Sequence, residues 1–432
     1  MSSRFHSVRL IEDKCRGCTN CLKHCPTEAI RIYDRRAHII DERCIDCGEC
    51  IRICDYHAKV AQTDTLEDIR RFPYPIALPA PTLYGQFRHI SDIAVIYDAL
   101  IQIGFKEVAD VARGADVVTM AIRRALKDPK RARPLISSAC PTVTRIIQAR
   151  FPALIPNIIN IRQPMEIAAQ IARRDYVKAH GVKPEDIGIF FITPCAAKMT
   201  SVRNPIGHAS SSVDGAISIM EIYGHVQPLV SKILPIGRKP EFSPLGIGWA
   251  GSGGELDAAA SRNSIAVDGI DNVIRVLEEL DNNTITDLDY FEGSACQGGC
   301  VGGPLNYENN YLARNTIRAI QDTMPQALPE QFAENVDLGQ DSLYFDQDIL
   351  PNDAMKLHES IAGAIERMEE MNRIIDSLPG YDCGSCGSPT CLSFAEDIVR
   401  GNFSETDCVY ILRDSLKVMA QKMVDISKTK RE

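Results

Sequence analysis

The grouping of its sixteen cysteines constrains this chain more than any other feature of its sequence. The cysteines lie in tight groups that are separated by ordinary globular sequence along 432 residues. An even number of cysteines in a secreted chain would favour disulfides, but the N-terminal sequence MSSRFHSVRLIEDKC lacks the apolar core of a secretory signal. Grouped cysteines in a cytoplasmic protein are more often metal ligands. We therefore expect a cytoplasmic metalloprotein whose cysteines bind metal rather than one another.

The composition argues against a nucleic-acid-binding protein and against a membrane-spanning one. With 45% hydrophobic residues, the chain can bury a substantial core and form two or three domains. Its net charge of −9 argues against a nucleic-acid partner. No stretch of about 18 apolar residues occurs, so we expect no membrane span.

Residues 1–60 contain an internal repeat. Each half follows the pattern Cys-x2-Cys-x2-Cys-x3-Cys, which is typical of [4Fe–4S] sites and resembles two-cluster ferredoxins, small α+β domains. In that pattern, three cysteines of one repeat and the last cysteine of the other bind each cluster. The expected ligands are Cys15, Cys18, Cys21 and Cys54 for one cluster, and Cys44, Cys47, Cys50 and Cys25 for the other. A pair of zinc knuckles is the alternative, and it fits less well because zinc sites usually need only two cysteine pairs and often use histidine.

The pattern changes after the repeat. Residues 61–87 are rich in proline and are interpreted as a linker. Residues 88–350 show an α/β pattern, in which Ile187–Thr193 and Ser264–Asp268 are predicted to be buried strands of a largely parallel sheet. A helical apolar stripe in residues 351–378 predicts a connecting helix.

Four cysteines of the α/β region occur in three distant segments. Cys140 lies in Ser-Ser-Ala-Cys-Pro, Cys195 lies in Thr-Pro-Cys-Ala-Ala-Lys, and Cys296 and Cys300 lie in a glycine-rich segment. Each segment follows an apolar run, so each is expected at the end of a strand, where open α/β sheets collect their ligands. These four thiolates could complete one further [4Fe–4S] cluster.

These segments resemble the catalytic domain of [FeFe] hydrogenases, which carries a Cys-Cys-Pro, a Pro-Cys-x2-Lys and a Cys-x3-Cys segment in this order. The resemblance covers most of residues 88–310 and implies two lobes of mostly parallel sheet flanked by helices. It implies that Cys140, Cys195, Cys296 and Cys300 bind the cubane of an H-cluster, a [4Fe–4S] cluster joined to a diiron subsite with CO, cyanide and a bridging dithiolate. Cys300 would bridge to that subsite, and Lys198 would donate a charge-assisted hydrogen bond to a cyanide. The implied substrates are H2 and protons, and hydrogenase maturation machinery would insert the diiron subsite.

Four positions depart from the catalytic members of that family. Ala139 replaces a cysteine that relays protons, and Ser201 replaces an acidic residue of the same relay. Thr193 and Ser294 stand where methionines pack the diiron site, which predicts a more polar pocket. General acid–base relay typically contributes about 10²–10⁴ in rate. We therefore expect slow turnover, which resembles the sensory branch of the family.

A replacement proton route could use Ser137, Ser138 or Glu292. Of these, only Glu292 has a useful pKa. The alternative is that Glu292 is a buried structural residue with a partner.

Residues 379–432 carry the last cysteine group and a helical tail. The expected ligands of a C-terminal [4Fe–4S] cluster are Cys383, Cys386, Cys391 and Cys408, in a pattern that resembles a small four-cysteine domain of anaerobic redox proteins. A zinc site is the alternative. With this group, all sixteen cysteines have an assigned role.

Three functional hypotheses follow from the sequence. The first is a slow [FeFe] hydrogenase, catalysing reversible H2 oxidation and proton reduction, that senses H2 or redox state and signals through a redox or signalling partner. The second is a metabolic hydrogenase with a non-standard proton route. The third is a non-enzymatic iron–sulfur relay or assembly factor without the diiron subsite. A homodimer is among the expected assemblies.

Overall fold

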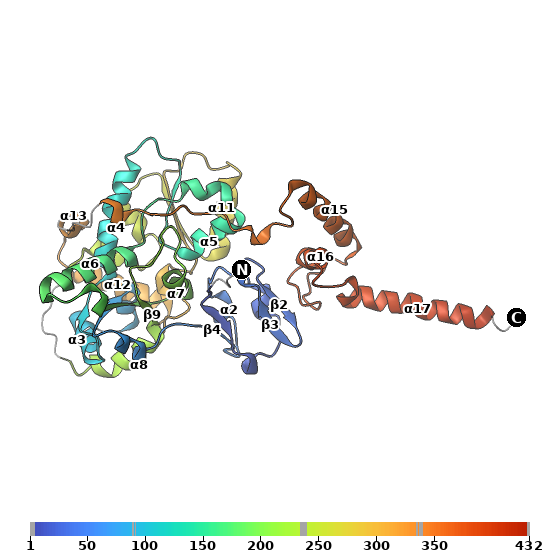
Figure 1. The fold of residues 1–432 in the computed structure, drawn as a ribbon, viewed down its shortest axis with the longest axis horizontal. Coiled ribbons are helices and arrows are strands. Elements are labelled where there is room, and N and C mark those ends of the chain that lie inside the picture. The colour runs from blue at the N-terminus through green and yellow to red at the C-terminus, as the bar shows by residue number, and fades with distance from the viewer. Residues whose placement is uncertain are drawn as a thin grey trace. The chain divides into compact units, whose positions relative to one another are not determined.

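The computed structural model describes residues 5–88, 90, 92–233, 240–333, 336 and 340–429, and the chain forms two compact units (Figure 1). Unit 1 comprises residues 1–8, 45–48 and 61–352. Unit 2 comprises residues 9–44, 49–60 and 353–432. No helix in the described ranges is both long enough and apolar enough to cross a membrane.

Unit 1 contains two parallel sheets. The first has the strand order β6 (Glu107–Val108), β5 (Tyr74–Pro79), β8 (Ile187–Thr193) and β9 (Gly215–Ser218). The second has the order β10 (Ser264–Asp268), β11 (Tyr290–Ser294) and β7 (Leu135–Ile136). All strand pairs within the two sheets are parallel. The predicted two-lobed α/β architecture is therefore confirmed.

Helices flank both sheets (Figure 1). They are α3 (Ala94–Gln102), α4 (Val111–Leu126), α5 (Pro141–Arg150), α6 (Pro164–His180), α7 (Ala196–Arg203), α8 (Ile219–Val230), α9 (Pro244–Gly248), α10 (Gly254–Ala259), α11 (Ile270–Asp281), α12 (Asn310–Thr323), α13 (Pro329–Ala333) and α14 (Gln340–Leu343). Strand β8 is buried along its whole length, as its apolar sequence predicts. Strand β10 has the predicted bounds but is only half-buried, because it lies at the edge of its sheet.

The interpretation of residues 61–87 as a linker is wrong. This segment contains β5, an interior strand whose backbone is paired with β6 on one side and β8 on the other. The prolines of this segment argued against a strand, because proline has no backbone N–H to donate to a neighbouring strand. The Pro75 carbonyl accepts from the Lys106 backbone N–H, so Pro75 and Pro79, which is four residues further on, face β6. Since β6 has only two residues, the missing donors disrupt little of the sheet.

Unit 2 combines the N-terminal repeat with the C-terminal cysteine group. The repeat contributes α1 (Asn20–Lys23), α2 (Glu49–Arg52) and an antiparallel hairpin of β2 (Ile30–Tyr33) and β3 (Arg36–Ile39), and β1 (Val8–Leu10) pairs with β4 (Lys59–Ala61). The C-terminal part contributes α15 (Ile361–Ser377), α16 (Cys391–Val399) and α17 (Val409–Thr429).

Helix α15 does more than connect two domains. Ile374 and Leu378, at its C-terminal end, pack with Phe394 and Ala395 of α16 in one small apolar core. Helix α15 therefore belongs to the C-terminal domain, which begins before the predicted boundary at residue 379. The apolar stripe is used over only part of its length, since Ile361 near the start of α15 is 82% exposed.

Candidate active site and iron–sulfur centres

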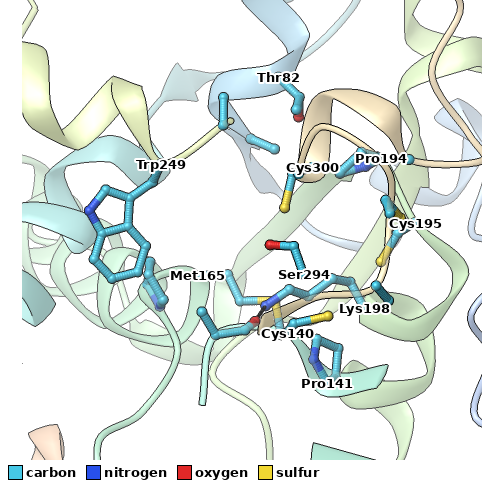
Figure 2. A pocket seen from close by; sticks show the side chains of 18 of the residues that line it. Thr82, Cys140, Pro141, Met165, Pro194, Cys195, Lys198, Trp249, Ser294 and Cys300 are labelled. Carbon is cyan, nitrogen blue, oxygen red and sulfur yellow. Dashed lines mark hydrogen bonds between the residues drawn. The ribbon is translucent and has the colours of Figure 1, made fainter. Parts of the chain in front are cut away.

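The four cysteines of the α/β region line one cavity in unit 1 (Figure 2). Cys195 follows β8 of the first sheet, whereas Cys140 follows β7 and Cys296 follows β11 of the second sheet. Cys300 opens the short helical turn Cys300–Gly302. The cavity thus lies at the carboxyl ends of strands from both lobes, where α/β folds place their ligands.

The thiols of this cavity are costly to ionise in the protein alone. Burial and the nearby Cys296 and Cys140 raise the pKa of Cys195 to about 12. The pKa of Cys300 is raised further by the same causes, although its side chain is accessible from within the cavity. Four converging thiols in a buried site require a cationic group for the thiolate form, so their chemistry fits an iron–sulfur cluster.

Close backbone approaches fix the cysteine loops against one another. A Cβ atom at Gly303 would lie 2.3 Å from the carbonyl oxygen of Pro194, the residue before Cys195. Gly299 has a φ of +88°, a left-handed conformation that favours glycine. The glycine-rich segment therefore lets the Cys300 loop pack directly on the Cys195 loop.

Lys198 projects from α7 toward the same cavity (Figure 2). Its Nζ donates to the Ala139 carbonyl oxygen at 2.9 Å and to Oε1 of Gln163 at 2.7 Å. Burial lowers the pKa of Lys198, while the surrounding cysteines oppose that change. An ammonium group has three donors, so one remains for an anionic ligand in the cavity.

The other predicted site residues divide into two groups. Ala139, Glu292 and Ser294 line the cavity. Thr193 and Ser201 are buried outside its lining, which corrects the expectation that Thr193 packs the diiron site. The Thr193 hydroxyl contacts the backbone of Cys195, and the Ser201 hydroxyl donates to the Ala197 carbonyl. Small hydroxyls adjacent to turns and helices satisfy local backbone groups in this way.

Glu255, which the sequence interpretation missed, also lines the cavity. Its carboxylate accepts hydrogen bonds from Ser137 Oγ at 2.9 and 2.8 Å and from the Tyr290 hydroxyl. Burial raises the pKa of Glu255 toward neutrality. The signal in the sequence was the run Gly251-Ser252-Gly253-Gly254 just before Glu255, which predicts a tight loop presenting a carboxylate.

Glu292 supports the loop that carries Glu255. Its two carboxylate oxygens accept from the backbone N–H groups of Gly253 and Leu256, each at 2.8 Å. Burial, together with the neighbouring Glu255 charge, raises the pKa of Glu292. Glu292 therefore lines the cavity, as a proton relay would. It also has the buried hydrogen bonds expected of a structural residue, which was the alternative role. Ser138 takes no part in this network, since its hydroxyl donates to the Ile161 carbonyl.

The N-terminal repeat brings one predicted ligand set together in unit 2. Burial raises the pKa of Cys21 to about 11, and the nearby Cys18, Cys15 and Cys54 contribute to the increase. Cys54, from the second repeat, thus lies beside three cysteines of the first. Its sulfur also accepts the Ala58 backbone N–H at 3.3 Å, a contact of the kind that tunes iron–sulfur clusters.

Cys47, a predicted ligand of the other N-terminal cluster, lines the cavity in unit 1. It packs with Cys140 against one apolar cluster that contains Val143 and Ile146. This contact puts a predicted ligand of a second cluster next to the ligands of the cavity.

A second cavity gathers all four C-terminal cysteines, Cys383, Cys386, Cys391 and Cys408. This domain packs on the N-terminal repeat within unit 2: the Gly387 carbonyl accepts the Ile32 N–H at 2.9 Å, and a Cβ at Gly384 would lie 3.4 Å from Leu22. A buried ion pair joins Arg31 and Asp397 across the same contact. Leu22 follows Cys21, so the C-terminal cavity lies next to the loop of an N-terminal cluster.

We expect Cys386→Ser to lower the iron content by about four atoms per chain, because Cys386 is one of the four thiolates that would bind the C-terminal [4Fe–4S] cluster. Iron and zinc should be quantified in anaerobically purified protein. A loss of zinc at constant iron would instead identify the zinc site that the sequence left as an alternative.

Comparison with known protein families agrees with this geometry. Residues 74–233 and 251–304 match the family "Iron only hydrogenase large subunit, C-terminal domain". This chain belongs to the iron-only hydrogenase family. Residues 7–55 match a 4Fe-4S dicluster domain and residues 378–410 match an Fe-S cluster family. The predicted family and the order of its iron–sulfur domains are thus confirmed.

The similar proteins include hydrogenases and an assembly factor. The chain is 23% identical over 254 residues to iron hydrogenase 1 of Clostridium pasteurianum, covering 48% of this chain and 44% of that protein. It is 26% identical over 150 residues to the cytosolic Fe-S cluster assembly factor nar1 of Aspergillus flavus, covering 34% of this chain and 26% of that protein. The chain therefore spans less than half the length of these two relatives.

A solved structure shows the same fold. A variant of [FeFe]-hydrogenase HydA1 from Chlamydomonas reinhardtii superposes with a TM-score of 0.52 at 14% identity, covering 66% of this chain and 98% of that one.

Proposed function

We propose that this chain is an [FeFe] hydrogenase of low turnover that senses H2 or redox state and reports it to a redox or signalling partner. The observation that carries this proposal is the Lys198 amino group, which lies in a cavity lined by four cysteines and donates there to the Ala139 carbonyl oxygen and to Gln163 Oε1. A cubane needs only the cysteines, whereas a buried cation beside them suits an additional anionic ligand set such as cyanide.

Cys140, Cys195, Cys296 and Cys300 would hold the cubane, and Cys300 would anchor the diiron subsite. When bound there, that subsite supplies the metal centre at which H2 is converted reversibly into two protons and two electrons. The protein's own residues then exclude water, hold the anionic ligands through Lys198, and conduct protons and electrons away.

The carboxyl of Glu255 supports a proton route that replaces the one lost at Ala139. It lies on the cavity wall, its pKa is raised toward neutrality, and it contacts two hydroxyl groups, those of Ser137 and Tyr290. A group with a pKa near the working pH can accept and release protons readily. Glu255 would thus supply the proton-accepting group that Ala139 cannot provide, although it lies outside the positions that the sequence indicated.

Electrons would leave through the predicted clusters in order. Cys47 lines the active-site cavity, so the cluster of Cys44, Cys47, Cys50 and Cys25 would receive electrons first. The cluster of Cys15, Cys18, Cys21 and Cys54 would follow, and its loop contacts the C-terminal cysteine domain. The C-terminal cluster is then the exit to a partner protein.

A non-enzymatic assembly factor is the second candidate, because the chain is similar to nar1. The two functions share the cubanes and differ in the diiron subsite. A metabolic hydrogenase would share the whole cofactor with the sensor and differ only in rate.

The test is hydrogen–deuterium exchange by protein matured with hydrogenase maturation enzymes. Formation of HD from D2 in H2O, with slow net H2 uptake and evolution, supports the proposal. Fast uptake or evolution favours the metabolic enzyme, and no exchange by matured protein with intact [4Fe–4S] clusters favours the assembly factor.

We expect Lys198→Met to retain the cubanes while lowering diiron occupancy at least about tenfold, since methionine has similar length but cannot donate to an anion. Iron content and electron paramagnetic resonance would report the cubanes, and infrared bands would report the diiron subsite. The exposed Lys178→Met in α6 is the matched control. Equal diiron occupancy in both variants would contradict the assigned role of Lys198.

A further inference from the structure

Helix α17 carries an apolar stripe that is exposed in the described residues of unit 2, although its first member, Val409, also lines the C-terminal cysteine cavity. The helix extends away from α15 and α16 (Figure 1). Six side chains form this stripe, here named the α17 seam. They are Val409, Leu412, Leu416, Met419, Met423 and Ile426, and they are 42% to 72% exposed.

The spacing of the seam is that of a coiled coil. Its members are separated alternately by three and four residues over the 21 residues of α17, which gives a repeat of 3.5 residues. A straight α-helix has 3.6 residues per turn, so a strict 3.5-residue stripe stays in register only with a partner helix that supercoils around it. Val409, Leu416 and Met423 occupy the a positions, and Leu412, Met419 and Ile426 the d positions.

We propose that the α17 seam is the contact between two copies of this chain, which pair through a two-stranded coiled coil. A heptad seam is complementary to itself, because each a and d side chain inserts between those of an identical helix. The flanking positions allow this pairing: in a parallel dimer Ser415 would face Ala420 and Lys422 would face Ser427, so no like charges meet.

The distribution of charged and apolar residues around α17 also differs from that of a membrane-binding helix. Asp414 and Asp425 lie away from the seam, and Val418, on the face opposite Leu416, is apolar and 55% exposed. A helix that lies on a membrane has instead a broad apolar face and a strongly polar opposite face. The seam is narrow and is built for one helix.

The pairing has a consequence for the C-terminal iron–sulfur domain. Residue Val409, the first of the seam, directly follows Cys408, a predicted cluster ligand. In a parallel coiled coil the two C-terminal cysteine domains would lie at the same end of the pair. The dimer would then present two electron exits side by side.

Sedimentation velocity of the full chain across the micromolar range tests the proposal. We expect a reversible monomer–dimer equilibrium, and we expect Leu416→Lys to weaken it at least about 100-fold, because two lysines would replace a buried leucine pair. The matched control is Val418→Lys, which adds the same charge on the opposite face and should leave the equilibrium unchanged.

A charge-swap experiment excludes simple unfolding of the helix. A mixture of the Leu416→Lys and Leu416→Glu variants should form a heterodimer, because a residues meet in a parallel pair and the opposite charges attract. If Leu416→Lys instead pairs with Met419→Glu, the helices are antiparallel and the seam still joins two copies. The proposal would be overturned if the wild-type chain stayed monomeric, or if Val418→Lys weakened the dimer as much as Leu416→Lys. It would also be overturned if the wild-type chain bound anionic phosphatidylserine vesicles and monomeric Leu416→Lys did not.

Discussion

Glu255→Gln should lower the rates of H2 oxidation and proton reduction by about 10²-fold or more in matured protein, the lower end of what a positioned acid–base group contributes. Glutamine keeps the shape of the side chain and one acceptor oxygen, but it cannot take up or release a proton at neutral pH. The neighbouring donors Ser137 and Tyr290 would retain an amide oxygen as acceptor. The loss therefore measures proton transfer rather than the fold.

If Glu255 carries the protons, the rates of H2 oxidation and proton reduction should change with pH in opposite directions. Burial raises the pKa of Glu255, so the carboxyl is protonated at lower pH and ionised above its raised pKa. H2 oxidation needs the ionised form as proton acceptor and should increase as the pH rises through that pKa. Proton reduction needs the protonated form and should decrease over the same interval.

Two controls make this prediction specific. Glu255→Asp keeps a titratable group and should retain more activity than Glu255→Gln. Infrared bands of the diiron subsite should be equal in both variants, which shows that the cofactor is loaded. An unchanged rate and pH profile in Glu255→Gln would mean that protons use another route.

Asp397→Asn should destabilise unit 2 by about 3–5 kcal/mol, because breaking a buried ion pair leaves an uncompensated charge. Asp397 accepts from Arg31 Nε at 2.5 Å and Nη2 at 3.0 Å, and from Ser388 Oγ at 2.6 Å. Both charged side chains are less than 5% exposed. This pair joins the C-terminal cysteine domain to the N-terminal repeat within unit 2.

Anaerobic guanidinium titration, followed by the visible circular dichroism of the clusters, measures this effect. The exposed Asp414→Asn, which loses a surface pair with Lys417, should leave the midpoint unchanged. The double variant Arg31→Met with Asp397→Leu should be less destabilised than Asp397→Asn, because it leaves no buried charge. Equal midpoints for Asp397→Asn and wild type would show that the pair does not hold the two parts together.

The sequence predicted most of what depends on local pattern. The apolar run Ile187–Thr193 became β8 at the predicted bounds, because a strand buried on both faces reads as a continuous apolar segment. The four cysteines of the α/β region lie around one cavity, since each of their three segments follows a parallel strand. Apolar runs, and the cysteine segments that follow them, were sufficient for these predictions.

What the sequence did not predict depends on distant contacts. Pro75 and Pro79 suggested a linker, and only the shortness of β6 explains why a strand tolerates them there. Glu255 is set on the cavity wall by Glu292, 37 residues away along the chain, through backbone hydrogen bonds that no motif records. Thr193 and Ser201 occupy the matching sequence positions but turn their hydroxyls to nearby backbone groups.

We predict that this chain holds a diiron subsite beside the cubane of the cavity. Infrared spectroscopy of the matured protein tests it most directly, because CO and cyanide bound to iron absorb where no protein group does. We predict CO and cyanide bands that shift when H2 is added and that are lost in Lys198→Met. Matured protein with intact [4Fe–4S] clusters and no such bands would contradict the account and would identify the chain as an iron–sulfur protein without hydrogenase chemistry.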